Sequence, residues 1–101
     1  MVSANELQNL YNDIYVQMRM YIWDFGTIEL LADFEIAVYQ RFPDISAVVK
    51  AFDKLRSEVS STDIYREDKE LKGAFEAFDE FIEDVDEIYY GLVTFKEVVD
   101  V

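Results

Sequence analysis

The chain has 101 residues, of which 51% are apolar and 16% aromatic, with only three glycines and one proline. This composition excludes intrinsic disorder and predicts one globular domain, residues 1–101, that folds without disulfides. The absence of cysteine and histidine excludes thiol catalysis, histidine-based nucleophile triads and the usual zinc ligand sets. With 22 acidic and 9 basic residues the formal net charge is -13, which disfavours direct contact with nucleic acid or anionic lipid and favours a cationic partner.

The first predicted helix begins at a capping residue, Ser3 or Asn5, and runs to about Phe25. Its apolar residues recur at helical spacing from Leu7 onward and define one inward face. Gly26 is expected to end it.

A second apolar line lies on the opposite side of this predicted helix and consists of Val16, Met20 and Trp23. The C-terminal half of the helix is therefore nearly apolar all round and must be covered on both sides. Another element of the fold, a second copy of the chain or a partner protein supplies that cover, so these three residues form the candidate dimer or second interface.

The second predicted helix covers residues 28–41, with Thr27 as its cap and Pro43 as its stop. Its polar arc is narrow, which predicts a central position in the fold. The arc consists of Glu29, Asp33 and Gln40. Glu35 lies outside it, either as a desolvated carboxylate or as a residue at the core edge whose head group reaches water.

Asp44 is expected to cap a third helix that runs to about Val59 and has the clearest amphipathic pattern of the chain. Lys50, Lys54 and Arg56 make it the least acidic helix, so we expect it to lie near the acidic helix described next. Residues 60–68 are polar and are predicted to form the longest connection, with Ile64 or Tyr65 turned inward.

A long helix is predicted from Leu71 to Leu92, because apolar residues recur there in an unbroken alternation of four and three. Gly91 is a candidate C-terminal cap. A short helical turn over residues 95–100 follows, with a short strand as the alternative.

The opposite face of the long helix is acidic, and no Lys or Arg occurs between Gly73 and Phe95. Its members are Glu76, Asp79, Glu80, Glu83, Asp84, Asp86 and Glu87. Several pairs stand four residues apart, where like charges destabilise a helix by roughly 0.2–0.5 kcal/mol each. A helix selected only for stability would interleave lysines, so this face is the predicted partner-binding site, with a merely solvated surface as the alternative.

Four helical segments joined by short links predict an all-α fold, a small four-helix bundle-like domain with a short C-terminal helix or strand. No run of 18 uncharged apolar residues occurs, and the N-terminus lacks the pattern of a secretion signal. We expect a cytoplasmic protein that binds neither a membrane nor a cofactor.

The leading functional hypothesis is a non-enzymatic binding protein that masks or inhibits a basic, nucleic-acid-binding partner. Seven carboxylates over roughly 16 Å of helix approach the charge density of duplex DNA, about one per 1.7 Å. Phage anti-defence proteins and nuclease immunity proteins are often small and acidic in this way, and DNA mimicry is the mechanism expected. A structural or regulatory helical homodimer is the alternative from a different class.

Three acidic pairs have a spacing of three: Glu67 with Glu70, Glu76 with Asp79, and Glu80 with Glu83. This spacing resembles that of the all-α nucleotide pyrophosphohydrolases related to MazG. The resemblance implies Mg²⁺ held between two facing helices. Here the pairs lie in or next to one helix, so a magnesium-dependent hydrolase is the third hypothesis.

Overall fold

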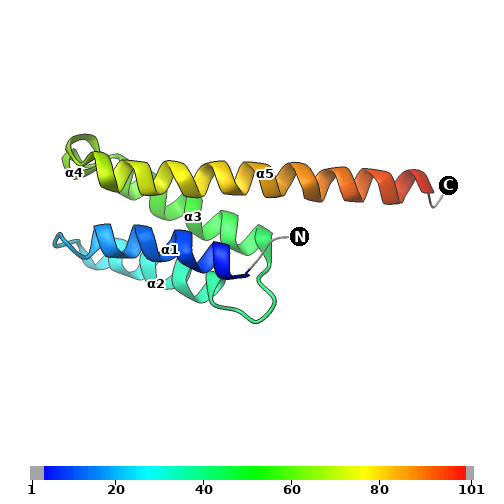
Figure 1. Ribbon diagram of the computed structural model, residues 1–101. Helices are drawn as coiled ribbons and strands as arrows, with labels where there is room; N and C mark the ends of the chain where they lie inside the picture. The colour runs from blue at the N-terminus through cyan, green and yellow to red at the C-terminus, as the bar shows by residue number, and fades with distance from the viewer. Residues whose placement is uncertain (1–3, 100–101) are drawn as a thin grey trace.

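A computed structural model describes the backbone of residues 4–99 and the side chains of residues 5–85. Over these residues the chain forms five helices and no strand, which confirms the predicted all-α, bundle-like fold (Figure 1). The helices are α1 (Ala4–Met18), α2 (Phe25–Val38), α3 (Ile45–Ser60), α4 (Asp63–Glu67) and α5 (Lys69–Val99). The molecule measures 53 × 24 × 21 Å, because α5 runs on past the ends of the other helices.

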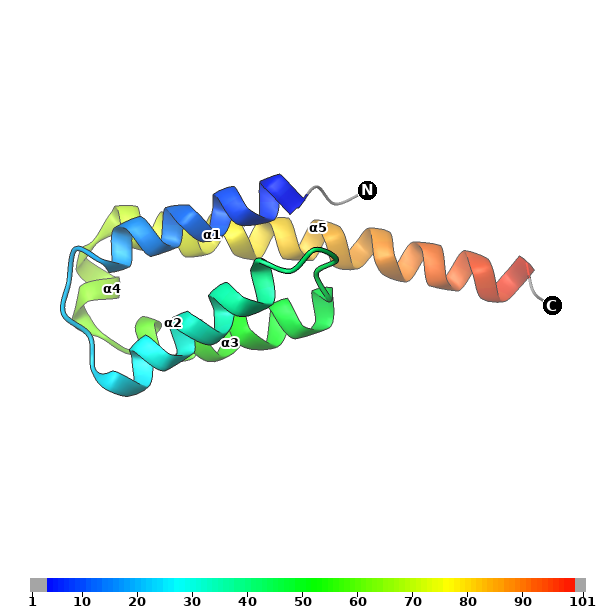
Figure 2. The ribbon, with the colours of Figure 1, turned by 90° about the horizontal axis from the view of Figure 1, so that it is seen from below.

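The four long helices run up and down as two pairs, which Figure 2 shows side by side. α1 packs along α5, and α2 packs along α3, while α1 also touches α2 and α4 links α3 to α5. The arrangement is that of an antiparallel bundle with short connections.

Four phenylalanines from three helices fill the centre of the bundle. Phe34 of α2 meets Phe78 of α5 edge to face, with ring centroids 4.9 Å apart, and Phe52 of α3 stacks on Phe78 at 4.7 Å. Phe75 of α5 also stacks on Phe52, with ring centroids 5.9 Å apart. Such aromatic pairs contribute about 0.5–1.5 kcal/mol each beyond the burial of their surface, so this cluster fixes how α2 and α3 sit against α5.

Most members of the predicted apolar stripes are buried, although Leu10, Tyr21, Ile45 and Val49 are only partly buried and Phe25 is exposed. The buried members are Leu7, Tyr11, Ile14 and Met18 in α1, Val48, Phe52, Leu55 and Val59 in α3, and Leu71, Phe75, Phe78, Ile82 and Val85 in α5. Tyr65 of α4 is buried, as predicted for residues 60–68. The side chains of Tyr89 and Leu92, which continue the stripe of α5, lie outside the described residues.

The first helix ends earlier than predicted, at Met18 and not at Phe25. Its last turn tightens, because the amides of Met20 and Tyr21 donate to carbonyls three residues back. The indole Nε1 of Trp23 then donates to the carbonyl oxygen of Met18 at 2.7 Å. The Met18 carbonyl thus accepts from both the Tyr21 amide and the Trp23 indole, and these two hydrogen bonds stabilise the turn away from α1.

The second helix begins at Phe25, so the predictions that Gly26 ends a helix and that Thr27 caps one are wrong. Asp24 is the N-cap, and its Oδ1 accepts from the amide of Thr27 at 3.0 Å. Aspartate is a stronger N-cap than threonine because its carboxylate also suits the positive end of the helix dipole.

α2 ends at Val38, three residues before the predicted Arg41, and it is not central. In a bundle of four helices each helix turns only one stripe to the core, and α2 buries only Thr27, Phe34 and Val38. Leu30, Leu31 and Ala37 are partly buried against the core, whereas Phe25, Ile28, Ala32 and Ile36 lie at the surface. Glu35 is exposed, which agrees with the reading that its head group reaches water.

The third helix begins after Asp44 as predicted, with the Asp44 carboxylate accepting from the amide of Ser46 at 3.0 Å. The connection predicted at residues 60–68 contains a helix of its own, α4, which the hydroxyl of Thr62 caps. α5 then continues unbroken through Gly91 to Val99. A cap at Gly91, a separate last turn and a terminal strand are therefore all wrong.

Candidate functional site

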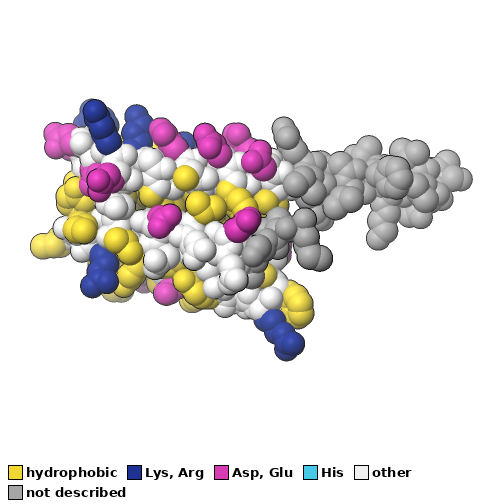
Figure 3. Space-filling model, viewed as in Figure 1, with side chains coloured by type: hydrophobic (Ala, Val, Ile, Leu, Met, Phe, Trp, Pro, Cys, Tyr) yellow, Lys and Arg dark blue, Asp and Glu magenta, His cyan; other side chains and the backbone are white. Residues whose placement is uncertain are grey.

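The predicted acidic face lies along α5 on the side away from the core. Glu76, Glu80, Glu83 and Asp84 are exposed there, and we call these four residues the acidic row. Figure 3 shows acidic side chains gathered along the edge of the molecule that α5 forms. None of the four takes part in an ion pair within the described residues.

Asp79 differs from the acidic row, because Arg56 of α3 pairs with it. The Arg56 Nη1 lies 3.0 Å from the Asp79 Oδ1, and each side chain is about one-third exposed. The guanidinium also lies over the ring of Phe52. This contact confirms the expectation that the least acidic helix lies near α5, and it neutralises one of the seven predicted site residues.

Asp86 and Glu87 continue along the backbone of α5, but their side chains lie outside the described residues. At the other end the acidic row is bounded by Lys69 and Lys72, which are exposed in the first turns of α5. The charge of α5 therefore changes sign along its length, from basic near α4 to acidic in the middle.

The three residues of the candidate dimer interface do not form one helical line. Val16 lies in α1, but Met20 and Trp23 follow its end, so the reasoning from an all-round apolar helix is wrong. Trp23 packs against the core and donates to Met18, whereas Met20 is 70% exposed. The three residues therefore do not lie on one face of one helix, and a dimer through them stays a prediction.

Val16 instead borders a shallow cleft between α1 and α5, with a volume of about 380 Å³. Its floor on the α5 side consists of small residues, Gly73, Ala74 and Ala77. These small side chains leave open space between α1 and α5, so this cleft follows from helix packing.

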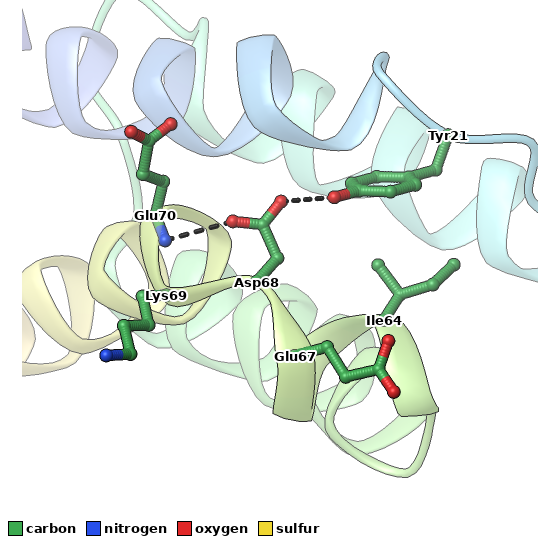
Figure 4. A pocket seen from close by; sticks show the side chains of 6 residues that line it. All are labelled: Tyr21, Ile64, Glu67, Asp68, Lys69 and Glu70. Atoms are coloured by element: carbon green, nitrogen blue, oxygen red, sulfur yellow. Dashed lines mark hydrogen bonds between the residues drawn. The ribbon is translucent and has the colours of Figure 1, made fainter.

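A second hollow lies where the chain leaves α1 and enters α5 (Figure 4). Tyr21 donates its hydroxyl to Asp68 there, and the other carboxylate oxygen of Asp68 accepts from the amides of Glu70 and Leu71 at 3.0 and 3.1 Å. The Tyr21 hydrogen bond lowers the pKa of Asp68, and the same bond raises the pKa of Tyr21. All these contacts cap α5 and tie it to the turn after α1, so they serve the fold.

The acidic pairs that resemble those of MazG-related enzymes do not face each other across two helices. Glu67 and Glu70 stand on either side of the Asp68 cap, and the other two pairs lie along α5. Within residues 5–85, no three acidic side chains converge on a position that could hold a metal ion.

An exposed apolar face on α2 is a surface feature that was not predicted from the sequence. Its residues are Phe25, Ile28, Ala32, Ile36 and Tyr39. Their spacing of three, four, four and three was visible in the sequence as a second helical stripe. It was overlooked because α2 was expected to be covered on all sides.

A scan against models of protein families, a search of curated proteins and a search of solved structures each give no match to this chain. Across the described residues, no helix has both the length and the apolar character that crossing a bilayer requires.

Proposed function

We propose that this chain is a non-enzymatic binding protein that inhibits or masks a basic, nucleic-acid-binding partner through its acidic row. The observation that carries the proposal is the exposure of Glu76, Glu80, Glu83 and Asp84, none of which forms an ion pair among the described residues. Like charges at this spacing destabilise α5, and folding alone gives no reason to retain them.

The spacing of the acidic row supports a mimic of one nucleic acid strand. From residue 76 to residue 84 the helix rises about 12 Å, so four carboxylates give one charge per roughly 3–4 Å. Each strand of a DNA duplex carries about one phosphate per 3.4 Å of helix axis. With Asp79 paired to Arg56, the free charges fit a strand better than the denser duplex.

Binding of this kind is fast and sensitive to salt, because electrostatic steering dominates the encounter. The partner is expected to lose access to its nucleic acid, since both ligands compete for the same cationic groove. The mechanism that we propose is therefore DNA mimicry, of the kind that anti-defence and immunity proteins use.

The test uses a variant in which the acidic row is neutralised by Glu76→Gln, Glu80→Gln, Glu83→Gln and Asp84→Asn. The matched control neutralises four exposed acids elsewhere: Glu6→Gln, Asp53→Asn, Glu58→Gln and Glu67→Gln. Both changes move the net charge from -13 to -9, because each removes four of the 22 acids. A difference in partner binding between the two variants therefore depends on where the charges are removed and not on the total charge.

Proteins captured by the wild type from an extract of its own cells are identified at low salt, and their affinities are then measured with purified components. We expect the row variant to bind a captured nucleic-acid-binding protein at least about tenfold more weakly than the control does. Single-stranded DNA should displace the wild type. Unchanged affinity of the row variant for every captured partner would reject the proposal.

A further inference from the structure

α2 carries a second apolar face that the bundle leaves uncovered. Phe25 is 75% exposed and Ile36 is 62% exposed, while Ile28 and Tyr39 are each about half exposed. With Ala32 between them, these residues form a line over five positions, which we call the α2 stripe. Tyr39, the C-cap at its end, also packs edge to face against Tyr11 of α1, so the uncovered part of the stripe runs from Phe25 to Ile36. A line of this kind is costly at the surface of a monomer and marks an interaction site.

The α2 stripe lies on the reverse of the buried face of the same helix. At 100° per residue, Phe25 stands about 180° around the helix from Phe34. Phe34 reaches inward to Phe78 of α5, so the stripe points away from α5 and from the acidic row. The two surfaces are therefore separate, and this inference does not rest on the function proposed above.

Acidic residues flank the α2 stripe on both sides. Glu29 and Asp33 follow one edge and Glu35 the other, and all three are exposed. None of them forms an ion pair among the described residues. Arg41 follows the C-terminal end of α2, and its guanidinium lies over the ring of Phe42.

A second copy of the chain fits this surface poorly. When two such stripes pack face to face, the flanking acids of both copies lie along the same seam, whether the helices run parallel or antiparallel. Each copy also carries a net charge of -13. Like charges set against one another at an interface cost several kcal/mol, so self-association is opposed.

The dimensions of the stripe suit a single helix. The 14 residues of α2 extend about 21 Å, whereas a stable interface between globular proteins buries roughly 800 Å² on each partner. A narrow apolar line with acidic borders matches a helix that has apolar residues at intervals of three and four and cations beside them.

We propose that the α2 stripe docks an amphipathic helical segment of another protein, apolar along one face and rich in lysine or arginine along both flanks. Ile28 and Ile36 supply the apolar contacts near the middle of the stripe, and Glu29, Asp33 and Glu35 pair with the flanking cations. The segment packs along α2 as a further helix of the bundle.

The probe is a synthetic leucine–lysine peptide about 18 residues long, with its leucines at helical spacing so that it spans the stripe. A scrambled peptide of the same composition is the control ligand. Binding is measured by fluorescence anisotropy to the wild type, to the double variant Ile28→Ser with Ile36→Ser, and to Ile22→Ser. Ile22 is 98% exposed in the turn between α1 and α2, so Ile22→Ser removes an exposed isoleucine that lies off the stripe.

We expect the double variant to lose about tenfold or more in affinity, while Ile22→Ser and the neutralised acidic row bind within about twofold of the wild type. In the wild type with labelled isoleucine methyl groups, the peptide should shift the NMR signals of Ile28 and Ile36 and leave that of Ile22. The methyl signals test the proposal without any substitution.

Three results would overturn it. The first is equal binding of the scrambled peptide, and the second is unchanged binding by the double variant with no shift at Ile28 or Ile36. The third is a wild-type dimer, seen by light scattering, that Ile36→Ser alone dissociates, which would assign the stripe to a second copy of the chain.

Discussion

Tyr11 buries a hydroxyl that has no hydrogen-bond partner among the described residues. Its ring is 2% exposed and packs edge to face against Phe34 and Tyr39, so the side chain is held for its aromatic surface. A buried hydroxyl without a partner costs stability, since it has given up its hydrogen bonds to water. The aromatic ring of Tyr11 therefore stabilises the fold, whereas its hydroxyl oxygen destabilises it.

Tyr11→Phe is therefore expected to raise the free energy of unfolding by about 1 kcal/mol, measured by urea denaturation at neutral pH. The variant keeps the ring contacts and removes only the oxygen. A loss of stability would show that the hydroxyl has a partner, such as a buried water. Tyr15→Phe is the control, because the Tyr15 side chain lies at the surface and stacks on Tyr11.

The same residue gives the expected response to alkali. Burial, with a smaller effect from Glu35, raises the pKa of Tyr11, whereas in the unfolded chain the phenol ionises near pH 10. Its contribution to stability is complete below about pH 10 and is lost above it, by up to about 1.4 kcal/mol per pH unit. The wild type should thus lose stability above pH 10 more steeply than Tyr11→Phe does.

Asp68 gives the opposite response, in acid. The hydrogen bond from Tyr21, followed by that from the Leu71 amide, lowers the pKa of Asp68 below the value of about 4 that it has when unfolded. Its contribution is therefore complete above about pH 4 and is lost as the pH falls towards its folded pKa. In thermal melts between pH 2 and 6, the melting temperature of Asp68→Asn should fall less as the pH is lowered than the melting temperature of Asp53→Asn. Equal dependence of the two variants would mean that Asp68 stays unpaired in solution.

At the level of helices, continuous periodicity predicted α3 and the apolar stripe of α5 because every turn repeats the same pattern. The end of α1 was not predictable in this way, since Tyr21 and Phe25 still fit the stripe of a helix that has already ended. The turn depends on the Trp23 indole reaching the Met18 carbonyl and on the Asp24 cap, and periodicity contains neither contact.

The candidate sites were predictable to different degrees for a related reason. The acidic row was found because a helix buried along one stripe must expose the opposite face. The sequence predicted that α3 lies near α5, but it did not predict the ion pair between Asp79 and Arg56, because that contact depends on how α3 packs against α5. The α2 stripe was missed because an apolar side chain in a sequence looks the same whether or not another helix covers it.

Gly73 lies inside α5, and a Cβ placed on it would meet nothing within 4 Å outside the adjacent helix backbone. No described glycine has a positive φ, so alanine fits the backbone without strain. Gly73→Ala is expected to raise the free energy of unfolding by about 0.5–1 kcal/mol, since alanine loses less conformational entropy in a helix interior. Gly26→Ala, in the first turn of α2, should raise the free energy of unfolding by less. A destabilised Gly73→Ala would contradict the open space beside α5.

The ion pair between Arg56 and Asp79 joins α3 to α5 at the edge of the core. Because both side chains are about one-third exposed, a double-mutant cycle with Arg56→Gln and Asp79→Asn should give a coupling of about 0.2–1 kcal/mol that weakens with salt. Asp79→Asn should leave partner binding almost unchanged, since Arg56 already neutralises this carboxylate. If no coupling were measured, Asp79 would have to be counted as a further unpaired carboxylate beside the acidic row.

For the whole molecule, the dominant electrostatic feature is an excess of 13 negative charges on a chain of 101 residues. Self-repulsion destabilises a compact state with so large a net charge, and salt relieves it as the screening length falls from about 10 Å at 0.1 M to 3 Å at 1 M. The chain as a whole should therefore melt at a higher temperature in potassium chloride than in dilute buffer.

The two charge variants separate this general repulsion from the local cost of the acidic row. Both have a net charge of -9, but only the row variant removes the like-charge pairs four residues apart, Glu76/Glu80, Asp79/Glu83, Glu80/Asp84 and Glu83/Glu87. At roughly 0.2–0.5 kcal/mol for each pair, the row variant should be about 1–2 kcal/mol more stable than the wild type at low salt. The control variant should gain less, and chemical denaturation at low and high potassium chloride measures both. If the two variants gained equally, the acidic row would carry no special cost to folding, and the stability argument for its function would fail even if the row binds a partner.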